Sequence, residues 1–257
     1  MNASDTPVAA WLHDTEFGWK ARLGVINPSA GITFDHEWAR MLPKGVSFHV
    51  TRLLLERGTT EALDAMAKQA PDAAALLKTS RVHAICYGCT IGSLYRGRAG
   101  EDELARKLSD VASAPAVMMA NSAVEALRAL GASRIAVANP YTAETNARVR
   151  AYLEECGFEI AAIETASIAE SWNITKLRPD EVYALAVRAI ERAGRLDALF
   201  LSCGNMRSID VIARIEADTG VPTISSNQAM LWKALRTVGV NEPLPGFGRL
   251  LERSPVS

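Results

Sequence analysis

The sequence predicts an α/β protein with two pseudo-symmetric lobes, each a mainly parallel four-stranded sheet flanked by helices, and a candidate active site in the cleft between them. Two observations lead to this prediction. Short apolar runs alternate with longer segments of helical periodicity, and the runs of the first half recur in the second half at a nearly constant offset. A repeat of this kind indicates a duplicated α/β unit.

Four matched pairs of segments define the repeat. They are 21–28 with 133–140, 45–51 with 157–163, 81–89 with 195–203, and 115–119 with 222–226. The offset is 112 in the first two pairs and 114 in the third. The third pair ends on a cysteine in both halves, Cys89 and Cys203. A cleft between two such units would therefore receive one thiol from each side.

Eight strands follow from the apolar runs, which lack strict alternation, as expected for strands buried on both faces. They are predicted at 21–27, 46–53, 82–88, 115–119, 134–139, 158–164, 197–202 and 221–225. Helices are predicted at 60–78, 101–112, 122–130, 143–156, 180–193, 207–218 and 227–238. The first helix places Leu63, Met66 and Ala70 on one stripe, and the third stops before Gly131, a common helix terminator. Such alternation predicts parallel sheets, which bind ligands at the carboxyl ends of their strands.

The predicted domain organisation comprises an N-terminal arm and two lobes. The arm is residues 1–20, the discontinuous first lobe is 21–120 plus 227–257, and the second lobe is 121–226. The first lobe is discontinuous because the last helix is expected to cross back onto it. The stretch 240–257 contains three prolines and two glycines, and we expect an extended tail there.

The bulk composition excludes several classes of protein. The 257 residues are 49% hydrophobic and 22% charged, as in ordinary globular proteins, and the formal net charge of -1 argues against a nucleic-acid partner. No apolar run reaches the roughly 18 residues of a membrane helix, so no membrane partner is expected. The first 20 residues do not read as a secretory signal, and four cysteines are too few for a disulfide framework. We therefore expect a cytoplasmic protein with reduced thiols, and a homodimer by default.

Two loops that begin with a cysteine carry the predicted chemistry. They are Cys89-Thr-Ile-Gly-Ser-Leu-Tyr95 and Cys203-Gly-Asn-Met-Arg-Ser208. Backbone N–H groups at a helix start, helped by Thr90, Ser93, Asn205 and Ser208, are predicted to hold a carboxylate and to lower a thiol pKa. Gly204 is also predicted to contact the substrate. A thiolate attacks carbon or removes a proton, and an opposite thiol returns one, so neither a cofactor nor a metal is expected. The alternative is that both cysteines are merely buried apolar residues.

Other polar residues fall at the same predicted edge of the sheets. Asn27 and Tyr141 follow the first strand of each half, and Asn173 follows the second strand of the second half. Asn227 either caps the last helix or reaches the cleft. His83 with the nearby cysteines looks like a metal string, but side chains on a strand alternate between faces and cannot share an ion there.

These residues resemble the aspartate/glutamate racemase superfamily, in its branch of maleate cis-trans isomerases and arylmalonate decarboxylases. The matching motifs are Tyr87-Gly-Cys-Thr-Ile-Gly-Ser93, Leu201-Ser-Cys-Gly-Asn-Met-Arg207, Asn139-Pro-Tyr141, Ser225-Ser-Asn-Gln-Ala-Met-Leu-Trp232 and Pro245-Gly-Phe-Gly248. The resemblance implies a two-lobed fold without a cofactor, in which Cys89 attacks the substrate double bond and Cys203 moves a proton. It also implies carboxylate binding by Tyr141 and Asn173, and by Thr90 as in the decarboxylases.

Two departures from these relatives shape the functional prediction. The decarboxylases have glycine in place of Cys89, so retention of both thiols favours isomerase or racemase chemistry on a small carboxylic acid. The isomerases carry an asparagine where this chain has Gly31, which puts maleate itself in doubt as the substrate. The alternatives are an arylmalonate-type decarboxylase with Cys203 as proton donor, and a non-catalytic small-acid binding protein.

Overall fold

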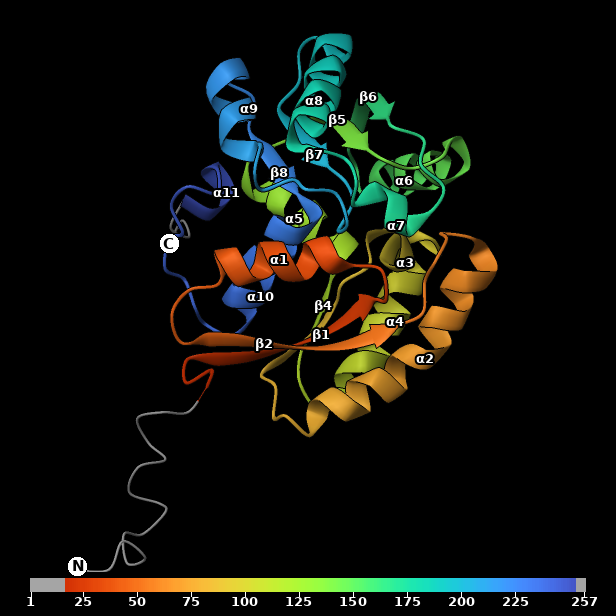
Figure 1. Cartoon of the computed structure of the whole chain (residues 1–257), viewed down its shortest axis with the longest axis vertical. Helices are drawn as coiled ribbons and strands as arrows, with labels where there is room; N and C mark the ends of the chain where they lie inside the picture. The colour runs from red at the N-terminus through yellow and green to blue at the C-terminus, as the bar shows by residue number, and fades with distance from the viewer. Residues whose placement is uncertain (1–16, 253–257) are drawn as a thin grey trace, which may run out of the picture.

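The computed structural model describes residues 17–252 as two four-stranded sheets flanked by helices (Figure 1). The strand order is β2-β1-β3-β4 in the first sheet and β6-β5-β7-β8 in the second. Every neighbouring pair of strands is parallel. The identical order confirms the duplicated α/β unit predicted from the repeat. We call the halves around the two sheets the first and the second lobe.

The central strands of the first lobe, β1 and β3, are buried on both faces. Its strands are β1 (Ala21–Pro28), β2 (Val46–Leu53), β3 (Ala84–Tyr87) and β4 (Ala116–Met118). Its helices are α1 (Ile32–Met41), α2 (Thr60–Lys78), α3 (Thr90–Leu94) and α4 (Gly97–Ala112). All four residues of β3 are buried, which explains why its sequence does not alternate between apolar and polar residues. Helix α2 begins where the Thr59 hydroxyl accepts a hydrogen bond from the Ala62 N–H at 3.3 Å.

The second lobe repeats this plan. Its strands are β5 (Arg134–Asn139), β6 (Glu159–Thr165), β7 (Ala198–Leu201) and β8 (Thr223–Ser225). The remaining helices are α5 (Met119–Ala129), α6 (Ala143–Glu155), α7 (Ser171–Ile174), α8 (Pro179–Ala193), α9 (Ile212–Thr219), α10 (Ser226–Thr237) and α11 (Arg249–Glu252). Helix α10 has a capping box in which the Ser225 side chain accepts from the Gln228 N–H.

Several segments differ from the sequence prediction, among them the short helix α7, which was not predicted. Helix α1 was not predicted, because Gly31 at its N-terminus provides no side-chain cap. Helix α9 begins at Ile212 and not at residue 207, because a buried side chain of the first lobe holds the preceding loop. The C-terminal stretch is not extended throughout, since α11 buries Leu250 and Leu251. The predicted arm falls mostly on residues 1–16, which lie outside the described residues.

Two helices lie between the sheets. Both α5 and α10 contact strands β4 and β8, and they also pack on each other. These contacts do not assign α5 or α10 to a single lobe. The lobe boundaries after residues 120 and 226 therefore stay a prediction. The packing places the carboxyl ends of β3 and β7 at a common boundary.

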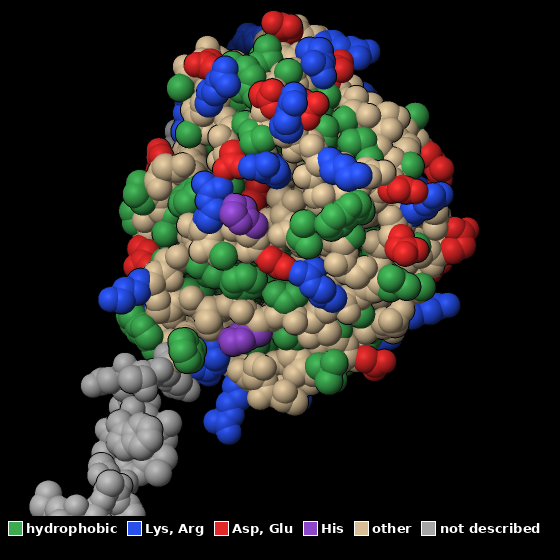
Figure 2. Space-filling model, viewed as in Figure 1, with side chains coloured by type: hydrophobic (Ala, Val, Ile, Leu, Met, Phe, Trp, Pro, Cys, Tyr) green, Lys and Arg blue, Asp and Glu red, His purple; other side chains and the backbone are tan. Residues whose placement is uncertain are grey.

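The surface and the helices give no sign of a bilayer-spanning segment. Among residues 17–252, no helix combines the length and the apolar character needed to cross a membrane. On the face shown in Figure 2, basic and acidic side chains are interspersed and form no single-sign field.

Candidate active site

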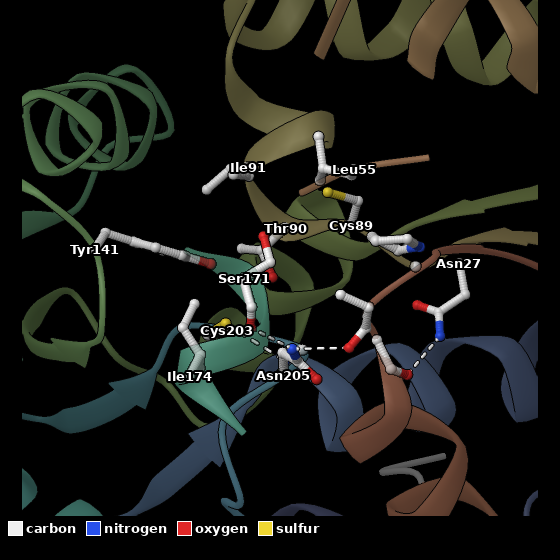
Figure 3. Close-up of a pocket in the computed structure, with 15 residues that line it drawn as sticks. Asn27, Leu55, Cys89, Thr90, Ile91, Tyr141, Ser171, Ile174, Cys203 and Asn205 are labelled. Carbon is white, nitrogen blue, oxygen red and sulfur yellow. Dashed lines mark hydrogen bonds between the residues drawn. The ribbon is translucent and has the colours of Figure 1, made fainter. Parts of the chain in front are cut away.

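A cavity between the two lobes receives both predicted cysteines (Figure 3). Its empty volume is about 440 Å³, including the part that opens to solvent. Residues of both lobes line it: Asn27, Pro28, Ala30, Gly31, Leu55, Gly88, Cys89, Thr90, Ile91, Tyr141, Ser171, Ile174, Cys203, Gly204 and Asn205. Cys89 follows β3 and Cys203 follows β7, so each thiol stands at the carboxyl end of the third strand of its lobe.

Each cysteine sulfur accepts a hydrogen bond from the backbone of its own loop. The Gly92 N–H lies 3.3 Å from Cys89 Sγ, and the Asn205 N–H lies 3.3 Å from Cys203 Sγ. The two loops therefore hydrogen-bond their cysteine sulfur atoms in the same way, as the repeat predicts. Amide donors of this kind stabilise negative charge on sulfur.

Burial has a larger effect on the two thiols than these donors. It raises the pKa of Cys89 to about 12 and that of Cys203 to about 11. The amide hydrogen bonds lower both pKa values but do not offset the loss of solvation. The backbone amides therefore lower the thiol pKa values as predicted, but burial outweighs them, and both groups are neutral thiols at pH 7.

Tyr141 and Thr90 provide hydroxyl groups at the cavity wall. In Figure 3 the Tyr141 ring points into the region between Thr90 and Cys203. Burial raises the pKa of Tyr141 well above its ordinary value, and the neighbouring Cys203 adds to the rise. Thr90 Oγ1 lies 3.0 Å from Ser226 Oγ, so the start of α10 orients it. Both side chains are almost fully buried and remain hydrogen-bond donors at neutral pH.

Asn205 lines the cavity but uses its side chain to join the lobes. Its Nδ2 donates to the Ala30 carbonyl at 3.0 Å and to the Ser171 carbonyl at 2.8 Å. Its Oδ1 accepts a 3.4 Å hydrogen bond from the Thr33 N–H. The Asn205 amide therefore fixes the cavity wall, and its backbone N–H is the group that reaches Cys203.

Asn27 shapes the opposite wall. Its Nδ2 donates to the Gly31 carbonyl at 2.8 Å, and its side chain is buried. A Cβ atom at Gly31 would lie 2.8 Å from this nitrogen. The space that a side chain at position 31 requires is therefore occupied by the Asn27 amide.

The structure does not bring Ser93 and Asn173 to this cavity. Ser93 lines a separate hollow behind α3, and its hydroxyl has no partner among the described residues. The Asn173 amide donates to Glu170 at 3.1 Å, and its oxygen accepts from Lys176 at 2.8 Å. Ser93 and Asn173 both lie on short helices, in which successive side chains point in different directions, so neighbours of a cavity residue can face away from the cavity.

Several lining residues carried no signal in the sequence. Leu55, Ser171 and Ile174 reach the cavity because two loops meet over it: the Ser171 N–H donates to the Glu56 carbonyl at 3.0 Å. An antiparallel bridge between Arg57 and Glu170 continues this contact. By contrast, Gly88 and Ile91 belong to the Tyr87–Ser93 motif that the sequence had singled out.

The lining offers no evident metal ligands. Among residues 17–252, no group of three or more histidine, cysteine or acidic side chains is arranged to hold an ion. Within the cavity itself, the titratable groups are the two thiols and Tyr141.

Fold and cavity together define an enzyme class in which two duplicated α/β lobes each contribute one cysteine to a shared substrate cavity. The chain belongs to the arylmalonate decarboxylase family, whose family model matches residues 23–251. This finding confirms the branch of relatives predicted from the cysteine motifs.

Individual relatives cover nearly the whole chain. The arylmalonate decarboxylase of Bordetella bronchiseptica is 30% identical over 233 residues, which are 90% of this chain and 97% of that protein. The maleate isomerase of Nocardia farcinica is 29% identical over 242 residues, covering 90% and 96%. A solved structure of a Nocardia farcinica maleate cis-trans isomerase mutant, with a covalently bound succinylcysteine intermediate, superimposes with a TM-score of 0.85 at 26% identity. It covers 90% of this chain and 98% of that one.

Proposed function

We propose that this protein is a cofactor-independent isomerase or racemase of a small carboxylic acid, with Cys89 and Cys203 as the reacting pair. The observation that carries the proposal is the presence of both thiols in one interlobe cavity, each hydrogen-bonded by an amide of its own loop. The succinylcysteine intermediate of the related isomerase supports covalent cysteine chemistry on such a scaffold.

In the isomerase reaction, Cys89 first loses its proton to water, and the resulting thiolate adds to the double bond of a cis-alkene acid. A carbon–sulfur bond forms, the electron pair of the double bond moves toward the carboxylate, and Cys203 gives its proton to the adjacent carbon. Rotation about the new single bond follows. The Cys203 thiolate then takes the proton back, and expulsion of Cys89 restores the double bond in the trans form. The Gly92 amide stabilises the Cys89 thiolate at both ends of this cycle.

In the racemase reaction, one cysteine loses its own proton to water and, as a thiolate, removes the α-proton, while the other delivers a proton to the opposite face of the carbon. The substrate carboxylate becomes an enediolate and carries the developing charge. Thr90 and Tyr141 donate from the cavity wall, and both are neutral donors at pH 7. Preorganised donors of this kind are typically the largest catalytic contribution.

The substrate that fits best has one carboxylate and a larger second group. Gly31 offers no side chain to a second carboxylate, and Asn27 fills that space. Past Ile91, Tyr141 and Ser171, the cavity adjoins a second hollow of about 1060 Å³. Polar and charged residues line this hollow, among them Arg57, Thr59, Thr60, Glu61, Thr142, Glu144 and Thr145. A polar extension of the substrate would be accommodated there.

Separate Cys89→Ala and Cys203→Ala enzymes test this proposal. They are assayed with cis-alkene acids by NMR and with chiral α-substituted acids by chiral chromatography, in deuterated water to record proton exchange. We expect kcat to fall by about 10³-fold or more in each. Cys156→Ala is the matched control, because Cys156 is buried outside the cavity. Near-normal turnover in either cavity variant would exclude the two-thiol scheme.

Decarboxylation of a substituted malonate is the second candidate, favoured by the family model and by the 30% identity to a decarboxylase. Here Cys203 alone protonates the carbanion left by carbon dioxide. A Cys89→Gly enzyme would keep or gain activity, and carbon dioxide release would be measured directly. A non-catalytic acid-binding protein would show ligand-induced thermal stabilisation without turnover in any of these assays.

The assembly and location of the protein belong to the same proposal. We propose a cytoplasmic homodimer with a small carboxylate as its ligand and without nucleic-acid or membrane partners. Light scattering on the purified chain tests the dimer, and a single-chain mass would exclude it.

A further inference from the structure

Helix α1 carries a carboxylate that is buried next to the Cys203 loop. Glu37 is 1% exposed, and it comes from the first lobe, whereas the loop belongs to the second. Glu37 Oε1 accepts hydrogen bonds from the Ser208 N–H at 2.6 Å and from the Ile209 N–H at 3.0 Å. These two contacts hold the end of the loop that begins at Cys203.

The other carboxylate oxygen acts on the start of the same loop through Asn227. Asn227 Nδ2 donates to Glu37 Oε2 at 2.7 Å and to the Gly204 carbonyl at 2.9 Å. Gly204 directly follows Cys203. Asn227, in the first turn of α10, is thus neither a helix cap nor a cavity residue; it connects Glu37 to the cysteine loop.

All three groups that face Glu37 are hydrogen-bond donors. A carboxylate is an acceptor only and satisfies all of them, whereas a glutamine would turn an NH₂ group toward at least one. Among the charged and titratable groups, Asp210 and Cys203 lie close enough to interact with Glu37. Arg40 and Arg207 pair with Asp210, at 2.5 Å and 3.4 Å. Glu37 is therefore left with hydrogen-bond donors and without a cation of its own among the described residues.

We propose that Glu37 is a positioning residue that fixes the Cys203 loop from the opposite lobe and so holds the Cys203 thiol in place at the cavity. The proposal deepens the proposed function and rests on it for the role of Cys203. The hydrogen bonds orient the loop, and the like charge disfavours the thiolate. Burial is the main cause of the raised pKa of Cys203, hydrogen bonds lower it, and the charge of Glu37 adds only a small rise.

The experiment measures the reactivity of Cys203 in Cys89→Ala protein with intact Glu37, with Glu37→Gln or with Glu101→Gln. Glu101 is the matched control: it is 1% exposed, lies on α4, and accepts hydrogen bonds from Tyr152 and the Asn121 N–H. Iodoacetamide labelling of Cys203 is followed against pH by peptide mass spectrometry. Glu37→Gln disrupts the hydrogen bonds that hold the loop, so Cys203 should become more exposed to water. We therefore expect its apparent pKa to fall and its labelling rate at pH 8 to rise about tenfold. Glu101→Gln should leave both unchanged.

A Cys203 pKa that is equal in the Glu37→Gln and Glu101→Gln proteins would overturn the proposal. Labelling needs no substrate, so this result does not depend on whether the proposed reaction is found. If the proposed function is wrong, the unmodified enzyme will instead show no turnover. Asn227→Ala, which leaves the charge in place, provides a second readout if Glu37→Gln does not fold. It should lower kcat about tenfold with little change in KM, and an unchanged kcat would also overturn the proposal.

Discussion

The stability of this protein should decrease as the pH rises from 5 to 8, because two buried carboxyl groups hold protons in the folded state. Burial raises the pKa of Glu37 from 4.5 to about 7, and it raises the pKa of Glu101 by the same amount. Between those values the folded chain binds more protons than the unfolded chain. Their stabilising contribution is complete below pH 4.5 and is lost as the pH passes 7.

The size of the effect follows from these pKa values. A difference between 4.5 and about 7 corresponds to roughly 3 kcal/mol for each carboxyl group. Small domains have only about 5–15 kcal/mol of stability in total. The decrease should therefore be easily measured, even if relaxation around the ionised groups reduces it by half.

Other titratable groups also affect how the stability depends on pH. Burial raises the pKa values of Asp35 and Glu216, which act in the same direction as the two glutamates. Burial lowers the pKa of His49, so this group opposes the trend and favours the folded state as the pH rises through 6.5. Hydrogen bonds hold the pKa values of Asp64 and Asp197 below 3.8, and their contribution is lost only in more acidic solution.

Urea unfolding at pH 5, 6, 7 and 8 measures the free energy of unfolding of the unmodified protein and of the Glu37→Gln and Glu101→Gln proteins. Each substitution removes one titrating group, so each variant should show a shallower decrease than the unmodified protein. The reasoning is refuted if the three proteins have parallel pH profiles, or if the unmodified protein becomes more stable across this range.

Three further predictions concern single side chains. In Gly92→Ala the new Cβ would lie 3.0 Å from Cys89 Sγ, so the thiol must move. We expect kcat to fall about 10²-fold while the circular dichroism spectrum stays unchanged. An unaffected kcat would contradict this prediction. Gly248 has a φ of +86° and a Cβ there would lie 2.4 Å from Ile212 Cγ2. Gly248→Ala should therefore lower the free energy of unfolding in urea by about 2 kcal/mol or more. A decrease of less than about 0.5 kcal/mol would contradict this prediction. Tyr141→Phe removes the buried hydroxyl that we propose donates to the substrate carboxylate, and it should lower kcat/KM roughly 10- to 100-fold. An unchanged kcat/KM would show that Tyr141 does not bind the substrate.

The two cysteines could be found from the sequence because local rules place them. An internal repeat fixes the equivalence of the halves, and a cysteine after the third strand of a parallel sheet must stand at the ligand-binding edge. The structure brings Cys89 and Cys203 to one cavity, together with Thr90 and Tyr141 from the same motifs. Strand positions and sheet type could be read for the same reason, since hydrophobic periodicity reflects burial within a single element.

The sequence alone determined the duplicated fold and the positions at which its strands present chemistry, because both follow from the order of residues along one element. Only the tertiary structure decided which side chains complete the site. Glu37 and Ser208 are 171 residues apart, and their contact exists because two lobes pack together. The same packing removes water from the thiols and raises their pKa values, although a helix start by itself would lower them.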